Sequence, residues 1–256
     1  MNRYINSNFN RWQNIKWNIK DALVVLLLSF IITAALQIIL TYVISCKYMN
    51  KDIYLTYETF IKISTEFWYI VGLIMVLDSL FFIAFPIFWV RIKHYGDLSI
   101  LGLNFNNWIK NFVIGAGYGI VFAGIFTIPY LQERFNYFHY YGYDPTKFDI
   151  YVYWFIVTKM FVLGPVGEEL LFTGFIFPAL AKRIGSVLSA IIVSTVFVVC
   201  YHPQIWFQFF SMLIVFLMKI IGIWLFLKKK TLIAPIGFHI GYNIIAFIGE
   251  VIRSSG

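Results

Sequence analysis

Residues 165–172 read Pro-Val-Gly-Glu-Glu-Leu-Leu-Phe, so two adjacent glutamates lie inside a long apolar segment. A carboxylate at the centre of a lipid bilayer costs on the order of 3 kcal/mol, and neighbouring carboxylates also repel each other. Because packing alone rarely repays such a cost, an ionisable residue in a membrane helix indicates a functional site. We therefore expect Glu168 and Glu169 to face protein or water rather than lipid.

The composition around this segment predicts a polytopic membrane protein. The chain has 256 residues, of which 61% are hydrophobic, 21% aromatic and 12% charged. Soluble domains are about 45–50% apolar and about 25% charged. The net charge of +8 is explained by basic cytoplasmic loops, so it does not indicate a nucleic-acid partner. The expected surroundings are the lipid bilayer.

Seven apolar segments have lengths close to those needed to span about 30 Å of hydrocarbon. They predict an all-α transmembrane bundle of about seven spans, within a range of six to eight. The fourth is too long for one straight span, so we expect a tilted helix, a helix that bends at Pro165 in its middle, or a helix followed by an interfacial piece. The segments are 21–45, 68–90, 111–131, 150–181, 186–202, 206–227 and 231–252.

The first twenty residues differ from the spans that follow. Residues 1–20 mix basic and aromatic side chains, among them Arg11, Trp12 and Trp17. This mixture is typical of an interfacial segment on an anionic cytoplasmic leaflet. The distribution of Lys and Arg among the loops also favours a cytoplasmic N-terminus. A composition rich in Ile, Asn, Lys, Phe and Tyr suggests an AT-rich genome, and on this ground we expect a bacterial cell membrane.

Three polar groups interrupt the C-terminal spans: Glu168 with Glu169, His202, and His239 with Asn243. His239 and Asn243 are four residues apart, so they share one helix face. At a helical rise of about 1.5 Å per residue, Glu168, His202 and Asn243 lie roughly 20–25 Å from the cytoplasmic ends of their helices. We therefore predict that these groups meet in one site.

The same residues resemble two motifs of a known family. Residues 167–175 read Gly-Glu-Glu-Leu-Leu-Phe-Thr-Gly-Phe, and residues 232–243 read Leu-Ile-Ala-Pro-Ile-Gly-Phe-His-Ile-Gly-Tyr-Asn. They resemble motifs of the CAAX-protease and bacteriocin-processing (CPBP, or Abi) intramembrane proteases, whose pattern is Glu-Glu-x-x-x-Arg, Phe-x-x-x-His and His-x-x-x-Asn or Asp. The resemblance, over roughly 98–250, implies a protease domain at 98–252 that follows N-terminal spans at 21–97.

The resemblance also implies a role for each group. Glu168 would be the general base that activates water, and His202 would polarise that water. His239 and Asn243 would face the oxyanion, and Glu169 would orient its neighbours. The implied protein is an integral membrane endopeptidase that acts on peptide or membrane-tethered substrates. Its expected roles are bacteriocin or pheromone processing, or bacteriocin self-immunity.

Two positions depart from the family pattern. Thr173 stands where the family has arginine, and Val198 stands where it has phenylalanine, with Phe197 one residue earlier. The family's arginine is thought to orient the glutamates or to hold the substrate's terminal carboxylate. We predict that Lys219, inside the sixth span, supplies this cation, which places Thr173 and Lys219 in the substrate-binding part of the site. The competing prediction is that Lys219 extends to the membrane interface.

Metal chemistry is an alternative for the same site. His202, His239 and Glu168 are adequate zinc ligands that leave one position for water. The chain has no His-Glu-x-x-His helix whose spacing would favour zinc. We expect a mechanism without a cofactor, with zinc as the second interpretation.

Two further charges lie within the spans. Asp78 is a candidate partner for Lys219 or forms a local hydrogen bond, whereas Lys159 is interpreted as a packing or interfacial residue without a role.

Two rival functions follow from the same residues. Loss of the motif arginine is compatible with a non-catalytic scaffold or immunity protein, and buried Glu, His and Lys are compatible with a proton-coupled transporter.

Overall fold

The computed structural model describes residues 14–48, 68–94, 97–126, 154, 157–201 and 209–254. Within these residues every regular element is helical, so the protein is the all-α membrane bundle that the composition predicts. Each of the seven predicted spans corresponds to a helical segment, and four are long and apolar enough to cross a membrane. These four are Ile19–Leu36, Trp108–Phe126, Lys159–Ile184 and Phe209–Lys229.

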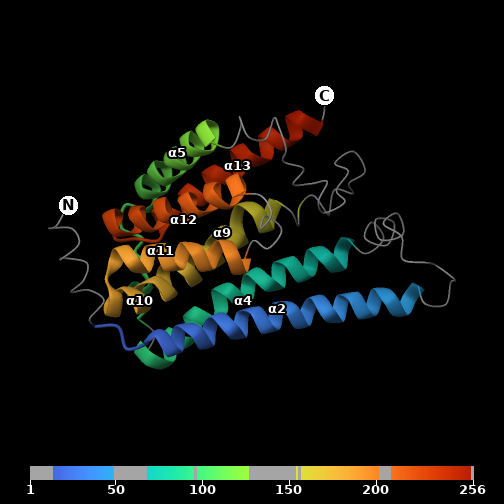
Figure 1. Cartoon of the computed structure of the whole chain (residues 1–256), viewed down its shortest axis with the longest axis horizontal. Helices are drawn as coiled ribbons and strands as arrows, with labels where there is room; N and C mark the ends of the chain where they lie inside the picture. The colour runs from blue at the N-terminus through green and yellow to red at the C-terminus, as the bar shows by residue number, and fades with distance from the viewer. Residues whose placement is uncertain are drawn as a thin grey trace.

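The helices form a layered bundle (Figure 1). Two N-terminal helices lie together on one side, α5 packs on α13 at the other side, and the remaining helices lie between them. The longer elements are α2 (Ile19–Tyr48), α4 (Trp68–His94), α5 (Trp108–Phe126), α11 (Ser186–Val196), α12 (Phe209–Lys229) and α13 (Ile233–Ser254). A short 3₁₀ turn, η1 (Leu98–Leu101), begins after Asp97, whose carboxylate accepts the Ser99 N–H.

The fourth span is irregular instead of being one straight α-helix. It consists of a π-helical turn η3 (Lys159–Leu163), a short α9 (Gly164–Glu168), a second π-helical stretch η4 (Glu169–Ile176) and α10 (Phe177–Ile184). Proline has no N–H and clashes with an ordinary preceding helical turn. The first π-turn ends at Leu163, two residues before Pro165, so the irregularity of this span is a change of helical register.

This composite span is the most completely buried of the four candidate spans. Every residue from Gly167 to Ala179 is buried, and aromatic rings surround it on several sides. The Phe172 ring meets Phe197 edge-on with 5.0 Å between centroids. Because the span lies in the centre of the bundle, both glutamates are removed from lipid, as their cost in a membrane requires.

Close backbone contact holds α5 against α13. Glycines four residues apart on each helix face the other helix, and a Cβ at any of them would overlap a backbone carbonyl of the opposite helix. At Gly119 that carbonyl belongs to Phe238. The glycines are Gly115 and Gly119 on α5, and Gly237 and Gly241 on α13. This contact sets the position of the α13 turn that carries His239.

The described part of the N-terminal segment packs into the bundle. The Trp17 ring is fully buried, stacks on Phe175 with 5.0 Å between centroids, and its Nε1 donates to the Phe175 carbonyl at 3.0 Å. Lys182 Nζ donates to the Ile15 carbonyl at 2.9 Å. Trp17 therefore packs into the bundle, where the central span offers its indole both a ring and a hydrogen-bond acceptor, and the interfacial placement of residues 1–20 stays a prediction. Arg11 and Trp12 lie outside the described residues.

Candidate functional site

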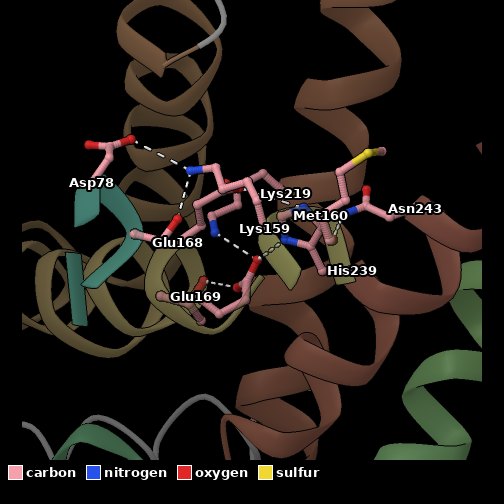
Figure 2. A network of polar contacts seen from close by, with 10 residues as sticks. Asp78, Lys159, Met160, Glu168, Glu169, Lys219, His239 and Asn243 are labelled. Atoms are coloured by element: carbon pink, nitrogen blue, oxygen red, sulfur yellow. Dashed lines mark hydrogen bonds and ion pairs between the residues drawn. The ribbon is translucent and has the colours of Figure 1, made fainter. Parts of the chain in front are cut away.

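Glu169 is the centre of a buried polar network. Its Oε1 lies 2.9 Å from Lys219 Nζ and 3.2 Å from His239 Nδ1. Its Oε2 accepts a hydrogen bond from Thr173 Oγ1 at 2.6 Å. Figure 2 shows the side chains of Lys219 and His239 converging on this carboxylate. Three elements contribute to the network: η4 carries Glu169, α12 carries Lys219 and α13 carries His239.

Lys219 does not extend to the membrane interface. Its relative exposure is 0%, and its Nζ lies 4.6 Å from the ring centroid of Phe197 and 5.4 Å from that of Phe172. A buried ammonium needs a paired carboxylate, and Glu169 supplies it. The competing prediction of an interfacial Lys219 is thus wrong, because this pairing and the aromatic rings offset the cost of burial.

Glu168 is the last residue of α9 (Gly164–Glu168), and its carboxyl group faces the His239 imidazole from the side opposite Glu169. Its Oε2 lies 3.6 Å from His239 Nε2, so His239 is placed between the two glutamates. Among the described residues, no donor lies within hydrogen-bonding distance of this buried Oε2. Leaving a buried carboxyl oxygen without a hydrogen bond is costly, and such groups mark sites where water or substrate binds.

The charges of the network divide into two groups. The carboxylate of Glu169 and the ammonium of Lys219 form a compensated pair. Glu168 and His239 form the second group, with 3.6 Å between Oε2 and Nε2, a separation across which one water can relay a proton. The arrangement can therefore move a proton at Glu168 Oε2 and His239 Nε2 without leaving net charge in the membrane.

Asn243 is held by a carbonyl of the π-turn. Its Nδ2 donates to Met160 O at 2.7 Å, as Figure 2 shows. In a regular helix that carbonyl would accept an N–H from four residues further along, but the Gly164 N–H donates to Lys159 O. The next residue, Pro165, has no N–H to offer. The amide of Asn243 therefore satisfies a carbonyl that the irregular turn leaves open.

A second polar cluster joins α2 and α4 to the π-turn. Lys159 Nζ lies 3.5 Å from Asp78 Oδ2 and donates to Ser79 Oγ at 2.8 Å. Thr33 Oγ1 donates to Asp78 Oδ1. Asp78 thus pairs with Lys159 and not with Lys219. Lys159 is thus packed within the bundle, and its ion pair with Asp78 was not predicted; two opposite charges within separate spans were the signal that could have revealed the pair.

Some predicted groups are not brought together within the described residues. His202 lies in the undescribed stretch 202–208, so its predicted place beside Glu168 and His239 stays a prediction. Within the described part of the chain, no group of three His, Cys, Asp or Glu is arranged to hold a metal ion. Val198 is buried, and Phe197, one residue earlier, packs against Phe172.

Comparison with known protein families gives a match over part of the chain. Residues 150–245 match the family model described as type II CAAX prenyl endopeptidase Rce1-like. This segment contains Glu168, Glu169, Lys219, His239 and Asn243, whereas α2, α4 and α5 precede it. The searches of curated proteins and of solved structures gave no match.

Proposed function

We propose that this chain hydrolyses peptide bonds within the membrane, because residues 150–245 match the family model of type II CAAX prenyl endopeptidases. Glu168 is the general base for an attacking water, and His239 is its acid–base partner. The observation that carries this proposal is the buried Oε2 of Glu168, which lacks a donor among the described residues and lies 3.6 Å from His239 Nε2.

The proposed reaction follows from these two atoms. A water beside the pair gives a proton to Glu168 Oε2 while its oxygen attacks the carbonyl carbon of the scissile bond. The resulting oxyanion is stabilised by the N–H at Nε2 of His239 in its imidazolium form. The proton held by Glu168 then passes to the leaving nitrogen as the C–N bond breaks, which yields a carboxylic acid and an amine.

The residues around Glu168 and His239 orient the reacting groups, and most of them are buried in the protein. Glu169 holds the opposite nitrogen of the imidazole. Asn243 bonds to Met160 O through one of its two amide protons, so the other proton is available to the proposed oxyanion. His202 is proposed to polarise the same water. Thr173 and Lys219 bind the Glu169 carboxylate, so we assign them to its support and not to direct contact with substrate.

We propose that the mechanism uses no metal ion. The described residues offer two of the three zinc candidates, His239 and Glu168, and His239 Nδ1 is already engaged by Glu169. The buried ammonium of Lys219 next to Glu169 opposes a dication at that carboxylate. The check is metal analysis of the active, purified protein together with activity after chelation, and bound zinc whose removal abolishes cleavage would contradict this version.

The proposed substrates are peptides or membrane-tethered proteins, in keeping with the burial of the site within a membrane helix bundle. We propose a bacterial cell membrane with the N-terminus in the cytoplasm. Bacteriocin leaders, peptide pheromones and bacteriocin self-immunity are the roles that best suit such a protein. A farnesylated CAAX peptide is the alternative substrate, because the matching family model is named for that chemistry.

The test is cleavage in proteoliposomes by the wild type and by Glu168→Gln, which keeps the shape of the side chain but removes the base. Two probes are used, a farnesylated CAAX peptide and a mixture of unmodified membrane-tethered peptides, and the products are identified by mass spectrometry. We expect cleavage that falls by about 10²–10⁴-fold in Glu168→Gln.

Two outcomes would favour the rival functions. Equal products from the two proteins, or none from either, would favour a non-catalytic scaffold or immunity protein. Proton-coupled uptake that is lost in Glu168→Gln, without any cleavage, would favour a transporter, for which the second buried pair of Asp78 and Lys159 is the supporting observation.

A further inference from the structure

We infer that Lys219 is a positioning residue that decides which nitrogen of His239 carries a proton. Lys219 keeps Glu169 ionised, Glu169 accepts the N–H at Nδ1 of His239, and Nε2 is thereby left to exchange protons with Glu168 and substrate. This inference rests on the proposed function for its consequences in catalysis, but the contacts that carry it do not depend on the reaction.

The burial of Lys219 separates it from any substrate. Its relative exposure is 0%, and its Nζ is bounded by the Glu169 carboxylate at 2.9 Å and by the rings of Phe172 and Phe197. A cation in this position has no surface with which to contact a peptide. Its charge therefore acts on Glu169, and through Glu169 on the imidazole.

Removal of Lys219 would change the charge on Glu169. Glu168 and Glu169 are adjacent and both buried, so without the ammonium His239 would be the one remaining cation paired with them among the residues that the structure describes. Protonation of Glu169 is the least costly response in a medium of low dielectric constant. A protonated carboxyl donates a hydrogen bond, so Nδ1 would have to accept it, and the neutral ring would carry its proton at Nε2.

Thr173 fixes the orientation of the same carboxylate. Its Oγ1 donates to Oε2 at 2.6 Å, while Lys219 and His239 both contact Oε1. The two oxygens therefore have separate tasks, and Oε1 alone carries the charge contact and the imidazole contact. Position 173 is also within reach of the carboxylate, so a cation placed there can replace Lys219.

The test is ¹⁵N NMR of the purified, histidine-labelled protein in detergent. The ring signals of His239 are assigned by comparison with His239→Gln. We expect the wild type to be protonated at Nδ1, and Lys219→Met to shift the neutral ring toward protonation at Nε2. The matched control is Lys228→Met, because Lys228 is an exposed lysine on the same helix. An unchanged Nδ1–H signal in Lys219→Met would overturn the inference, as would an equal shift in Lys228→Met.

A relocated cation provides the rescue. In Lys219→Met/Thr173→Arg the charge approaches Glu169 from its own helix, and we expect the Nδ1–H signal to return. If Lys219→Met does not fold, Lys219→Met/Glu169→Gln is measured instead, since it removes both charges of the pair. Loss of the preference for Nδ1–H in that variant supports the inference, and its retention overturns it.

Activity gives a second readout once a cleaved probe is known. A carboxylate that fixes the tautomer of a catalytic imidazole is worth up to about 10⁴-fold in kcat in hydrolytic triads. We expect Lys219→Met to lower kcat on the order of 100-fold or more, with little change in KM. If no probe is cleaved but the tautomer still depends on Lys219, the proposed function fails while the positioning role stands.

Discussion

Lys159 of η3 pairs with Asp78 of α4, with 3.5 Å between Nζ and Oδ2, and both side chains are mostly buried. Asp78 lies outside the segment 150–245 that matches the protease family, whereas Lys159 lies inside it. Lys159 also directly precedes Met160, whose carbonyl binds Asn243. The N-terminal helices are therefore connected to the helix that carries His239.

We expect Asp78→Asn to destabilise the protein, because it leaves the Lys159 ammonium without its carboxylate. The side chains are 15% and 19% exposed, so we expect a loss of about 1–3 kcal/mol, less than for a fully buried pair. Thermal unfolding in detergent measures the loss. The control is Lys93→Met, which removes a 41% exposed lysine paired with Asp21 and should cost less than about 1 kcal/mol. Equal losses of stability in Asp78→Asn and Lys93→Met would show that burial of the ion pair does not set the size of the loss.

Asn243 and Pro165 are expected to be energetically coupled through Met160 O. Asn243→Ala leaves that carbonyl without its side-chain donor, which should cost about 1–3 kcal/mol. In a Pro165→Ala background, residue 165 regains an N–H that can donate to Met160 O in the π-helical register. Asn243→Ala should therefore lower the free energy of unfolding by less in that background. A double-mutant cycle of unfolding free energies measures this coupling. Strict additivity would show that the π-turn does not explain the position of Asn243.

Gly119→Leu is expected to separate α5 from α13 and to displace His239. A Cβ at this position would overlap Phe238 O, and backbone cannot yield as a flexible side chain does. We expect a loss of about 1–3 kcal/mol or more, together with reduced cleavage. Gly117→Leu and Gly124→Leu are matched controls on the same helix, because nothing lies within 4 Å of a Cβ at either position. These controls should be at least as stable as the wild type, and an equal loss in them would point to an effect of the leucine itself.

Trp17→Ala is expected to destabilise the bundle by about 3–5 kcal/mol, since it removes a fully buried ring and its hydrogen bond to Phe175 O. Trp17→Phe keeps the stack on Phe175 and should lose only about 1 kcal/mol with the indole N–H. The control is Trp108→Ala, at a tryptophan that is 52% exposed on α5. Unfolding midpoints in detergent should follow this order, and comparable loss at Trp108 would mean that Trp17 does not anchor the N-terminal segment.

Composition and local residue spacing were sufficient to predict the class of protein and most of the polar residues at its centre. Long apolar segments can satisfy their backbone groups in a membrane only as helices, so composition and segment length were sufficient for the all-α bundle. The cost of a carboxylate in lipid was sufficient to select Glu168 and Glu169 as a site. The spacing of His239 and Asn243 placed them on one helix face, because the helical repeat is a local property.

The pairing of these residues, in contrast, depends on how the helices pack against one another. Whether Lys219 reaches Glu169 or the interface depends on what packs around its helix, and a long side chain can do either. The pairing of Asp78 with Lys159, the burial of Trp17 and the bond from Asn243 to Met160 O each join segments far apart in the sequence. Periodicity describes one helix at a time, whereas these contacts depend on the register between helices, which close glycine packing and the π-turns set.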